Sequence, residues 1–328
     1  MSANESDSGY SSEDDGISLS RPVRFWLLLL FDVPSVICSF TILICLLGDR
    51  TSRRALHDHT TIVLITLCLT TLLIDIPSYL AFIINSGVVK PSVPATCMMW
   101  WFVAIGIYNS QQVLIAWIAV ERHIFIFYDR WLRNTRGKFF AHYLPLTLIL
   151  AYLFIFYIYA FFIYPCQNTF DYTTLYCNAN PCYQTGPLIR TWDLILNNIA
   201  PGLSEPIISM TLIIRVIRQK QRLSQGVQWR KHRKMVLQLI LASFMNVTLI
   251  VPLNVFSLAY LFGLPRDYGA EVVSYFYFFA YYLSLVLPFI FLTSIPRISR
   301  KVKSIFQCGR QEIAVGRTTY MNNRTHQR

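Results

Sequence analysis

One group of charged side chains closes a long apolar stretch of this sequence. Residues 117–130 read WIAVERHIFIFYDR, so Glu121, Arg122 and His123 stand together after many uncharged residues. A carboxylate and a guanidinium about 4 Å apart attract each other by about 4 kcal/mol at an effective dielectric near 20, before desolvation is deducted. Taken alone, Arg122 also fits an arginine that snorkels at a helix end.

Catalytic constellations are not apparent elsewhere in the chain. No Ser, His and acidic residue share one predicted depth in the apolar segments, and no cluster of metal ligands lies within them. Catalysis and metal binding both require several such groups to converge. The sequence therefore predicts neither an enzyme nor a bound metal or cofactor.

The composition indicates a protein of the lipid bilayer. Of the 328 residues, 54% are apolar and only 14% are charged, against about 25% charged in a soluble domain. A helix needs about 20 apolar residues to cross the hydrocarbon. Because lipid admits only helices or closed barrels, and these stretches are too long for barrel strands, we predict an all-α membrane protein with a seven-transmembrane helix bundle. The seven stretches run approximately over 25–48, 60–86, 97–126, 139–164, 193–214, 235–262 and 272–295.

The distribution of Lys and Arg predicts the orientation of this bundle. All but five of the 29 Lys and Arg residues fall on the face that carries the C-terminus. The exceptions are Arg21, Arg24, Lys90, Arg190 and Arg266. The positive-inside rule then places the N-terminus outside and the C-terminus in the cytoplasm, as in a multi-pass protein of the plasma membrane. Basic blocks between apolar spans favour contact with anionic membrane lipid, and we predict no nucleic-acid partner.

The two ends of the chain differ from the bundle. We predict an extracellular acidic tail over 1–23, the bundle over 24–296, an amphipathic helix on the membrane surface over 297–308, and a cytoplasmic tail over 309–328. Asn4 begins an Asn-Glu-Ser glycosylation acceptor on the external side. Cys308, at the end of the amphipathic segment, is a candidate for palmitoylation.

Four of the eight cysteines provide a second test of the topology. Cys97 begins the third span on the external side, and Cys166, Cys177 and Cys182 lie in the external loop 165–192. Four cysteines on an oxidising face allow two disulfides in three connectivities, and the sequence does not decide among them. We favour Cys97–Cys177, which leaves Cys166–Cys182.

With these features combined, the chain resembles the rhodopsin-like, or class A, G-protein-coupled receptors. Arg122 follows Cys97 by 25 residues, the separation that the family keeps, and Glu121-Arg122-His123 stands where the family has Asp-Arg-Tyr. At 1.5 Å per residue the separation is about 37 Å, so the two residues reach opposite faces of the membrane. The whole chain looks similar to divergent orphan receptors of small invertebrates. The resemblance implies a heterotrimeric G protein as partner and an extracellular ligand.

The prolines match the resemblance, while their neighbours depart from it. Pro206, Pro252 and Pro288 stand where the family has helix-kinking prolines in spans five, six and seven, and proline frees carbonyls and lets a helix bend. Ile250 replaces the family's Trp before the span-six proline, and the sequence LPFIF at 287–291 replaces Asn-Pro-x-x-Tyr. No carboxylate stands near Cys68 in span two, which argues against a sodium site of the family's type.

The resemblance also implies a mechanism for the Glu-Arg-His motif. In the family, the arginine is held by its neighbouring acid, and sometimes by an acid on span six, until span six swings outward and admits the G protein. Residues 229–234 read WRKHRK and supply no acid. We therefore expect Glu121 alone to restrain Arg122, with His123 beside them. The basic segments 130–138 and 215–234 are expected to contact the G protein or anionic lipid.

The family's ligand-pocket positions can be carried onto this chain. They are Ala104, Tyr108 and Asn109 in span three, Asn254 in span six, and Tyr277 and Tyr281 in span seven, with Asp75 of span two as the charged member. Ala104 stands where amine receptors carry an Asp, which disfavours a biogenic amine. Span seven has no Lys to form a Schiff base, which disfavours an opsin. The acidic tail and the cysteine-rich loop slightly favour a peptide ligand.

A seven-span transporter or ligand-gated channel is the alternative from another class. Transporters commonly contain inverted repeats with polar residues near the midplane, and channels line a path with polar or charged rings. No internal repeat is visible in this sequence, and the acids Asp32, Asp75 and Glu205 are scattered among the spans. The receptor interpretation is therefore preferred.

Overall fold

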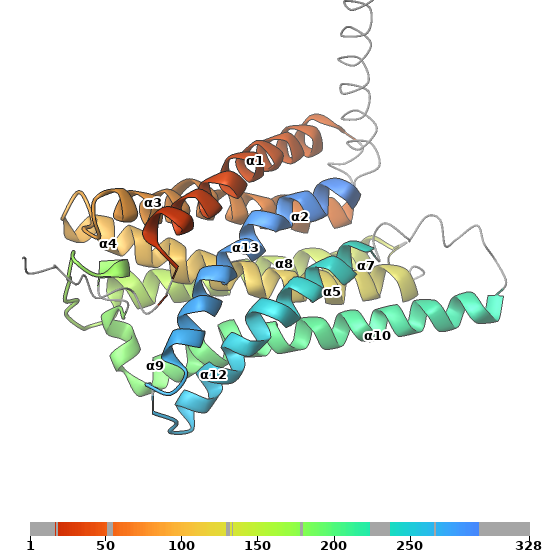
Figure 1. Ribbon diagram of the computed structural model, residues 1–328. Coiled ribbons are helices and arrows are strands. Elements are labelled where there is room, and N and C mark those ends of the chain that lie inside the picture. Colours follow the sequence, from red (N-terminus) through yellow and green to blue (C-terminus); the bar gives the residue numbers. More distant parts are fainter. Residues whose placement is uncertain are drawn as a thin grey trace, which may run out of the picture.

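The computed structural model describes the seven-helix region and most of its connections (Figure 1). Its described residues are 17, 19–50, 55–128, 132, 134–177, 180–223, 237–265 and 267–294. Within them the chain is all-helical, with no strands. Residues 1–16 of the predicted acidic tail, with Asn4, and the amphipathic segment 297–308, with Cys308, lie outside the described residues, whereas residues 21–23 of that tail already belong to the first helix.

Among the described residues, seven helices are long and apolar enough to cross a membrane, which agrees with the predicted number. We call them spans one to seven: Arg21–Gly48, Asp58–Ile84, Pro94–Phe127, Thr135–Ile163, Pro187–Arg218, Leu237–Leu261 and Ala270–Thr293. The predicted stretches differ from these mainly at their ends. Spans three and five begin before the first apolar run, because each opens with a proline that suits the first helical turn.

Most spans combine α-helix with short π-helical turns. The elements, in order, are α1 (Arg21–Gly48); α2 (Leu56–Thr70), η2 (Thr71–Asp75) and α3 (Ile76–Ile84); α4 (Pro94–Trp101), η3 (Phe102–Ile107) and α5 (Tyr108–Phe127); α7 (Thr135–Lys138), η4 (Phe139–Tyr143), α8 (Leu144–Ile158) and η5 (Tyr159–Ile163); α9 (Pro187–Trp192), η8 (Asp193–Ile199) and α10 (Ala200–Leu223); η9 (Asn246–Ile250) and α12 (Val251–Leu261); and α13 (Ala270–Ser294). The loop before span five holds the short 3-10 helices η6 (Leu175–Cys177) and η7 (Cys182–Thr185).

Prolines account for four of these π-helical turns. The segments η2, η4, η8 and η9 each end two residues before a proline, at Pro77, Pro145, Pro201 and Pro252 respectively. Proline lacks an N–H and its ring crowds the carbonyl four residues earlier, so the preceding turn widens. Pro206 and Pro288 instead lie inside the continuous helices α10 and α13.

Span three is the central helix of the bundle. Its segment α5 packs against α2 and α10, while α1 packs against α2 and α13. Gly106 allows a close approach of span four, because a Cβ there would lie only 3.1 Å from Cγ of Tyr157. Trp100 and Trp101 are almost fully buried in the same core. A central span whose contacts reach several neighbours can pass a displacement between them.

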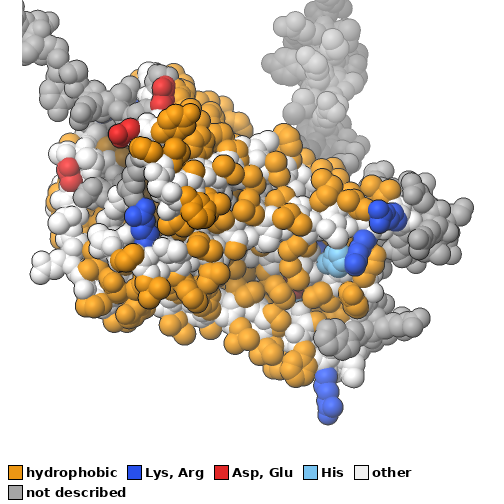
Figure 2. Space-filling model, turned by 90° about the horizontal axis from the view of Figure 1, so that it is seen from below, with side chains coloured by type: hydrophobic (Ala, Val, Ile, Leu, Met, Phe, Trp, Pro, Cys, Tyr) orange, Lys and Arg blue, Asp and Glu red, His pale blue; other side chains and the backbone are white. Residues whose placement is uncertain are grey.

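The outer surface matches a lipid environment. Large apolar side chains such as Leu30, Ile44 and Phe154 are more than half exposed. Figure 2 shows hydrophobic side chains over most of one face, with His and most of the visible Lys and Arg toward one end and Asp and Glu toward the other. This arrangement, apolar outside as well as inside, is expected of helices that lie in a bilayer.

The two ends of the bundle carry different chemistry. We call the end with the disulfides Cys97–Cys177 and Cys166–Cys182 the disulfide end, and the end with Arg122 the arginine end. The Cα atoms of the two cystines are 5.8 and 5.9 Å apart. Both favoured pairings are therefore confirmed.

Candidate functional site

Arg122 is tied to span six by a neutral side chain. It is 6% exposed, and its Nη2 donates a hydrogen bond of 2.8 Å to Oε1 of the buried Gln238. Gln238 was not predicted from the sequence, where only an acid on span six was considered as a partner. An amide oxygen accepts from a guanidinium as a carboxylate does, but it adds no opposite charge. This bond joins the Glu-Arg-His motif to the described start of span six.

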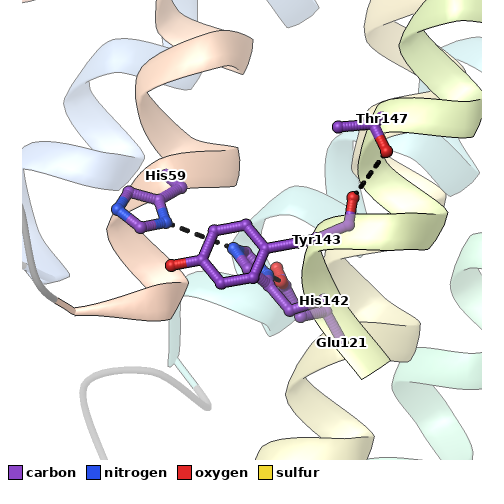
Figure 3. A network of polar contacts seen from close by, with 5 residues as sticks. All are labelled: His59, Glu121, His142, Tyr143 and Thr147. Carbon is purple, nitrogen blue, oxygen red and sulfur yellow. Dashed lines mark hydrogen bonds and ion pairs between the residues drawn. The ribbon is translucent and has the colours of Figure 1, made fainter. Parts of the chain in front are cut away.

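Glu121 binds span four rather than its neighbour Arg122 (Figure 3). Its Oε1 accepts a hydrogen bond from Nδ1 of the fully buried His142. The expectation that Glu121 alone restrains Arg122 is therefore wrong, because the hydrogen bond of Arg122 goes to Gln238. Adjacent residues on a helix point about 100° apart, so Glu121 and Arg122 reach different neighbours.

A second histidine extends the Glu121 contact to span two. Nε2 of His142 lies 3.3 Å from Nδ1 of His59, and the two rings lie beside Tyr143 (Figure 3). A carboxylate only accepts, so Nδ1 of His142 carries a proton toward Glu121. Nε2 of His142 and Nδ1 of His59 are within hydrogen-bonding distance, with one of the two nitrogens as the donor. The chain Glu121–His142–His59 links spans three, four and two at the arginine end.

His123, the third member of the motif, faces span five. Nε2 of His123 lies 2.8 Å from Nη1 of Arg215, and a guanidinium can only donate, so this histidine nitrogen is the acceptor. The guanidinium of Arg215 also lies 5.6 Å from the centre of the Phe127 ring. Together, the three residues of the motif contact spans four, six and five. The predicted coupling residues thus lie where four helices meet.

At the disulfide end, Asp75 lies in an aromatic enclosure. It is 2% exposed, and its Oδ1 accepts hydrogen bonds from Nε1 of Trp100 at 2.7 Å and from the hydroxyl of Tyr281 at 3.3 Å. Tyr79 packs on Tyr281 with ring centres 5.6 Å apart. The predicted pocket residues Asp75 and Tyr281 are therefore in direct contact.

A loop residue closes this enclosure. The hydroxyl of Tyr176 is hydrogen-bonded to that of Tyr281, and its ring centre lies 4.9 Å from that of Trp100. Burial, followed by the nearby carboxyl of Asp75, raises the pKa of the Tyr176 hydroxyl well above its usual value. Tyr176 therefore covers the predicted charged member of the pocket.

The backbone that carries Tyr176 is held in an unusual conformation. Tyr176 and Cys177 have φ angles of +53° and +50°, values that cost energy in residues other than glycine. The Cys97–Cys177 disulfide anchors one side, and Nε1 of Trp101 donates to the carbonyl of Tyr176 at 2.5 Å. Cys177 was predicted as a site residue but Tyr176 was not, although a residue next to a bridged cysteine must lie near the top of span three.

Three other predicted pocket residues, Ala104, Tyr277 and Asn109, differ in their burial and in their contacts. Ala104 is partly buried against the core, and Tyr277 is 58% exposed. Asn109 is buried and its Oδ1 accepts from Nδ2 of Asn198 at 3.1 Å. Asn109 is therefore bound to span five, whereas the hydrogen bonds described for Asp75 come from spans three and seven.

Two predicted pocket residues have polar atoms without a partner. The hydroxyl of Tyr108 and both side-chain atoms of Asn254 are buried and make no hydrogen bond. Asn254 is 1% exposed and lies against Gly202 of span five. A buried amide without partners is costly in lipid. These atoms are available for hydrogen bonds to a ligand or to water.

Asp193 is a buried acid that was not predicted as a site residue. Its carboxylate accepts from the hydroxyls of Tyr157 and Tyr183 at 2.8 Å each, and from Nδ2 of Asn197 at 2.9 Å. Burial and then the Asp193 charge raise the pKa of the Tyr183 hydroxyl well above its usual value. This cluster fastens the disulfide-bonded loop to spans four and five, so its role is structural.

Uncharged polar residues of spans two, three and seven are hydrogen-bonded to one another in the centre of the bundle. Nε2 of Gln111 donates to Oγ1 of Thr71 at 2.7 Å, and Oγ of Ser284 donates to Oε1 of Gln111 at 3.0 Å. Cys68 donates from Sγ to the carbonyl of Ser284 at 3.0 Å. These bonds join spans two, three and seven without a charge.

Comparison with known proteins gives no relative for this arrangement. The chain matches no family model, and no curated protein matches it. The structure itself shows the seven apolar helices among the described residues and the two disulfides, and a more specific interpretation is a proposal.

Proposed function

We propose that the protein is a rhodopsin-like G-protein-coupled receptor of the plasma membrane, with its disulfide end outside and its arginine end in the cytoplasm. The observation that carries this proposal is the hydrogen bond of 2.8 Å between Arg122 and Gln238. It joins the end of span three to the start of span six, where outward movement of span six opens a cleft for a heterotrimeric G protein. No covalent chemistry is required.

The resting contact between the two spans is weak enough to be reversible. A hydrogen bond to a charged group contributes about 1.5–3 kcal/mol. When two conformations of a protein differ in free energy by a few kcal/mol, the less stable one stays populated, and a ligand can select it. Because Gln238 brings no charge, we infer that the closed state is less strongly held than it would be by an acid on span six.

The orientation is supported by the charges at the arginine end. Arg136, Lys138, Arg215 and Arg218 all lie at the ends of spans four and five near this face. Basic side chains near the surface bind the anionic cytoplasmic leaflet at about 1 kcal/mol each. They also suit contact with a G protein once span six has moved. The disulfides belong to the opposite, oxidising side.

The enclosure of Asp75 supports a ligand with a cationic group. A carboxylate bordered by Trp100, Tyr281 and Tyr176 offers charge and aromatic faces together, which is the chemistry that binds ammonium and guanidinium groups. A peptide carries such groups at its N-terminus and on Lys or Arg. Because Tyr176 covers Asp75, the ligand must displace it, and this displacement is the first step toward the movement of span six.

The direct test is G-protein activation in cells. Wild-type and Arg122→Ala receptors, expressed at equal surface levels, are compared by energy transfer between labelled G-protein subunits from each of the main Gα classes. We expect measurable basal activation by the wild type and none by Arg122→Ala. The proposal is contradicted if the wild type activates no G protein, basally or with cationic peptide libraries, or if Arg122→Ala activates as well as the wild type.

A further inference from the structure

A groove opens at the lipid-facing side of spans two and three, toward the disulfide end. Its volume is about 300 Å³, at the lower end of the range of about 300–1,000 Å³ for small-molecule sites. Its lining comes from span two, from the connection 85–93 and from the first two turns of span three. Asp75 is not part of this lining, so the groove is distinct from the aromatic enclosure.

The wall and the floor of the groove are apolar. Leu73 and Pro77 of span two are exposed at its edge. Phe82 and Trp100, which are almost fully buried, form its floor, with ring centres 6.4 Å apart. From Leu73 to Ala81, the part of span two that lines the groove extends over about 12 Å at 1.5 Å per residue. An unbranched apolar chain can bury its methylene groups along such a surface.

Three polar side chains line the groove, and two of them have no partner. Oγ of Ser78 donates to the carbonyl of Ile74 at 2.6 Å, so its proton is used within span two. Lys90 and Thr96 make no ion pair or side-chain hydrogen bond with any residue that the structure describes. An ammonium and a hydroxyl without partners can both donate to an anion. No acidic residue is among the described residues of the lining, so the charge of Lys90 is not cancelled there.

The positive charge lies at one end of the groove. Lys90 belongs to the connection between spans two and three, which joins Ile84 to Pro94. Leu73 precedes the end of span two by three turns, which places it roughly 16 Å deeper at 1.5 Å per residue. A lysine keeps its ammonium in water at the interface while apolar groups lie in the hydrocarbon. The groove therefore has the polarity of an amphiphile with one anionic head and one apolar chain.

We propose that this groove binds a long-chain fatty acid, with the carboxylate at Lys90 and Thr96 and the chain along Leu73, Pro77 and Phe82. The volume suits one acyl chain better than the two chains of a phospholipid. Anionic phospholipids also belong mainly to the cytoplasmic leaflet, whereas the proposed function places the disulfide end outside. The choice of a fatty acid over an anionic phospholipid rests in part on that proposed orientation.

Trp100 connects the groove with the enclosure of Asp75. Its side chain lines the groove, while its Nε1 donates to Oδ1 of Asp75 at 2.7 Å. Its ring centre also lies 4.9 Å from that of Tyr176, the residue that covers Asp75. A chain packed against Trp100 would therefore restrain one wall of the enclosure. The binding itself does not depend on coupling to a G protein.

The experiment labels the groove with a fatty acid that carries a diazirine near the middle of its chain. The full-length protein is held in nanodiscs of zwitterionic phosphatidylcholine without a G protein. After irradiation at increasing probe concentrations, mass spectrometry identifies the labelled residues. We expect saturable labelling of the residues of spans two and three that line the groove. Oleate should compete with the probe, whereas methyl oleate, which has no charge, should compete at least about tenfold less well.

Variants then test the role of the charge and of the groove. Lys90→Gln should weaken the apparent affinity for the probe by about tenfold or more, because a hydrogen bond to a charged group is lost. Lys90→Arg keeps the charge and should retain most of the affinity. Arg190→Gln removes a charge at the start of span five, outside the groove, and should leave labelling unchanged. Leu73→Trp, at an exposed position, should fill the groove and reduce labelling.

Each outcome decides the proposal. Saturable labelling of the groove that oleate displaces and Lys90→Gln weakens supports it. Labelling spread evenly over the spans, or equal affinity in the wild type and Lys90→Gln, overturns it. The fatty-acid site is also overturned if phosphatidylglycerol competes as strongly as oleate, which assigns the groove to a phospholipid.

A contact between two copies of the chain is the remaining occupant to be tested. If Leu73→Cys receptors crosslink to each other equally well with and without oleate, the groove belongs to such a contact and the fatty-acid site is overturned. Nanodiscs expose both faces of the bundle, and the labelling needs no G protein. A negative result therefore refutes the groove alone and leaves the Arg122→Ala test of receptor function unaffected.

Discussion

The guanidinium of Arg122 and the side-chain amide of Gln238 meet at 2.8 Å across spans three and six. Both residues are almost fully buried, and the contact pairs a charge with a neutral dipole. The strength of such a contact can be tuned in either direction by one substitution. It therefore provides a graded test of how span six is held.

Substitutions of Gln238 should change basal signalling in opposite directions. Gln238→Leu removes the acceptor, and a bond worth about 1.5–3 kcal/mol shifts the equilibrium toward the open state by about tenfold or more. Gln238→Glu adds an opposite charge and should lower basal activation below that of the wild type. Energy transfer between G-protein subunits measures both, with surface expression as the control. Equal basal activity in the two variants would argue against the contact.

Breaking the contact between Glu121 and His142 should destabilise the bundle. His142→Phe leaves a buried carboxylate without its donor, and loss of one partner of a buried pair costs about 3–5 kcal/mol. Glu121→Gln should cost less, because an amide can still bond to the histidine. The double variant should recover part of the loss of Tm suffered by His142→Phe. Strictly additive losses would show that the two residues do not act as a pair.

Tyr176 should control access to Asp75. An Asp75→Cys receptor is treated with the cationic reagent 2-aminoethyl methanethiosulfonate, and the rate of labelling is followed by mass spectrometry. Adding Tyr176→Ala removes the ring that lies on Trp100 and the hydroxyl bound to Tyr281. We expect labelling to become at least about tenfold faster, which corresponds to about 1.4 kcal/mol of barrier removed.

Tyr172→Ala, in the same loop, serves as the matched control for this experiment. It should leave the labelling rate of the introduced cysteine unchanged, since the ring of Tyr172 stacks with that of Phe170. A receptor with native Asp75 corrects for the reactivity of the other cysteines, which include the free Cys38, Cys45 and Cys68 of the described residues and Cys308. Labelling that is equally fast with and without Tyr176 would contradict the covering role.

The Asp193 cluster should contribute to stability rather than signalling. Asp193→Leu leaves the hydroxyls of Tyr157 and Tyr183 without an acceptor, at about 1–3 kcal/mol for each buried group. Tm should fall by several degrees, and less for Asp193→Asn. Asp267→Leu, at an exposed turn, is the control and should change Tm little. A Leu variant as stable as the wild type would show that the cluster is dispensable.

The architecture was predictable because lipid imposes a simple length rule. A run of more than 20 apolar residues crosses a bilayer as an α-helix. Seven spans and their approximate bounds therefore followed from the sequence. The disulfides were predictable only as a preference, since Cys97 and three loop cysteines allow three connectivities. The starts of spans three and five were less accurate, because each span begins with a turn led by a proline, ahead of its main apolar run.

The partners of the charged residues were not predictable in the same way. Glu121 and Arg122 are neighbours in sequence, but a helix turns them toward different spans, where His142 and Gln238 meet them. Neither partner is distinctive in the sequence, since a lone His or Gln inside a span is usually a satisfied packing residue. Tyr176 reaches Tyr281 and Trp100, the two donors to Asp75, only because the loop folds back under its disulfide. Such long-range contacts depend on packing that local patterns do not encode.

The distance between span six and the rest of the arginine end is the decisive readout of the proposed switch. Spin labels are placed at the exposed positions Thr135 of span four and Leu241 of span six, in a background without free cysteines. The distances between the labels are measured by pulsed electron paramagnetic resonance in nanodiscs. We expect Gln238→Leu to add a population several ångströms longer than that of the wild type, and G protein to enlarge it. Identical distance distributions in the wild type and the variant, with and without G protein, would contradict this mechanism.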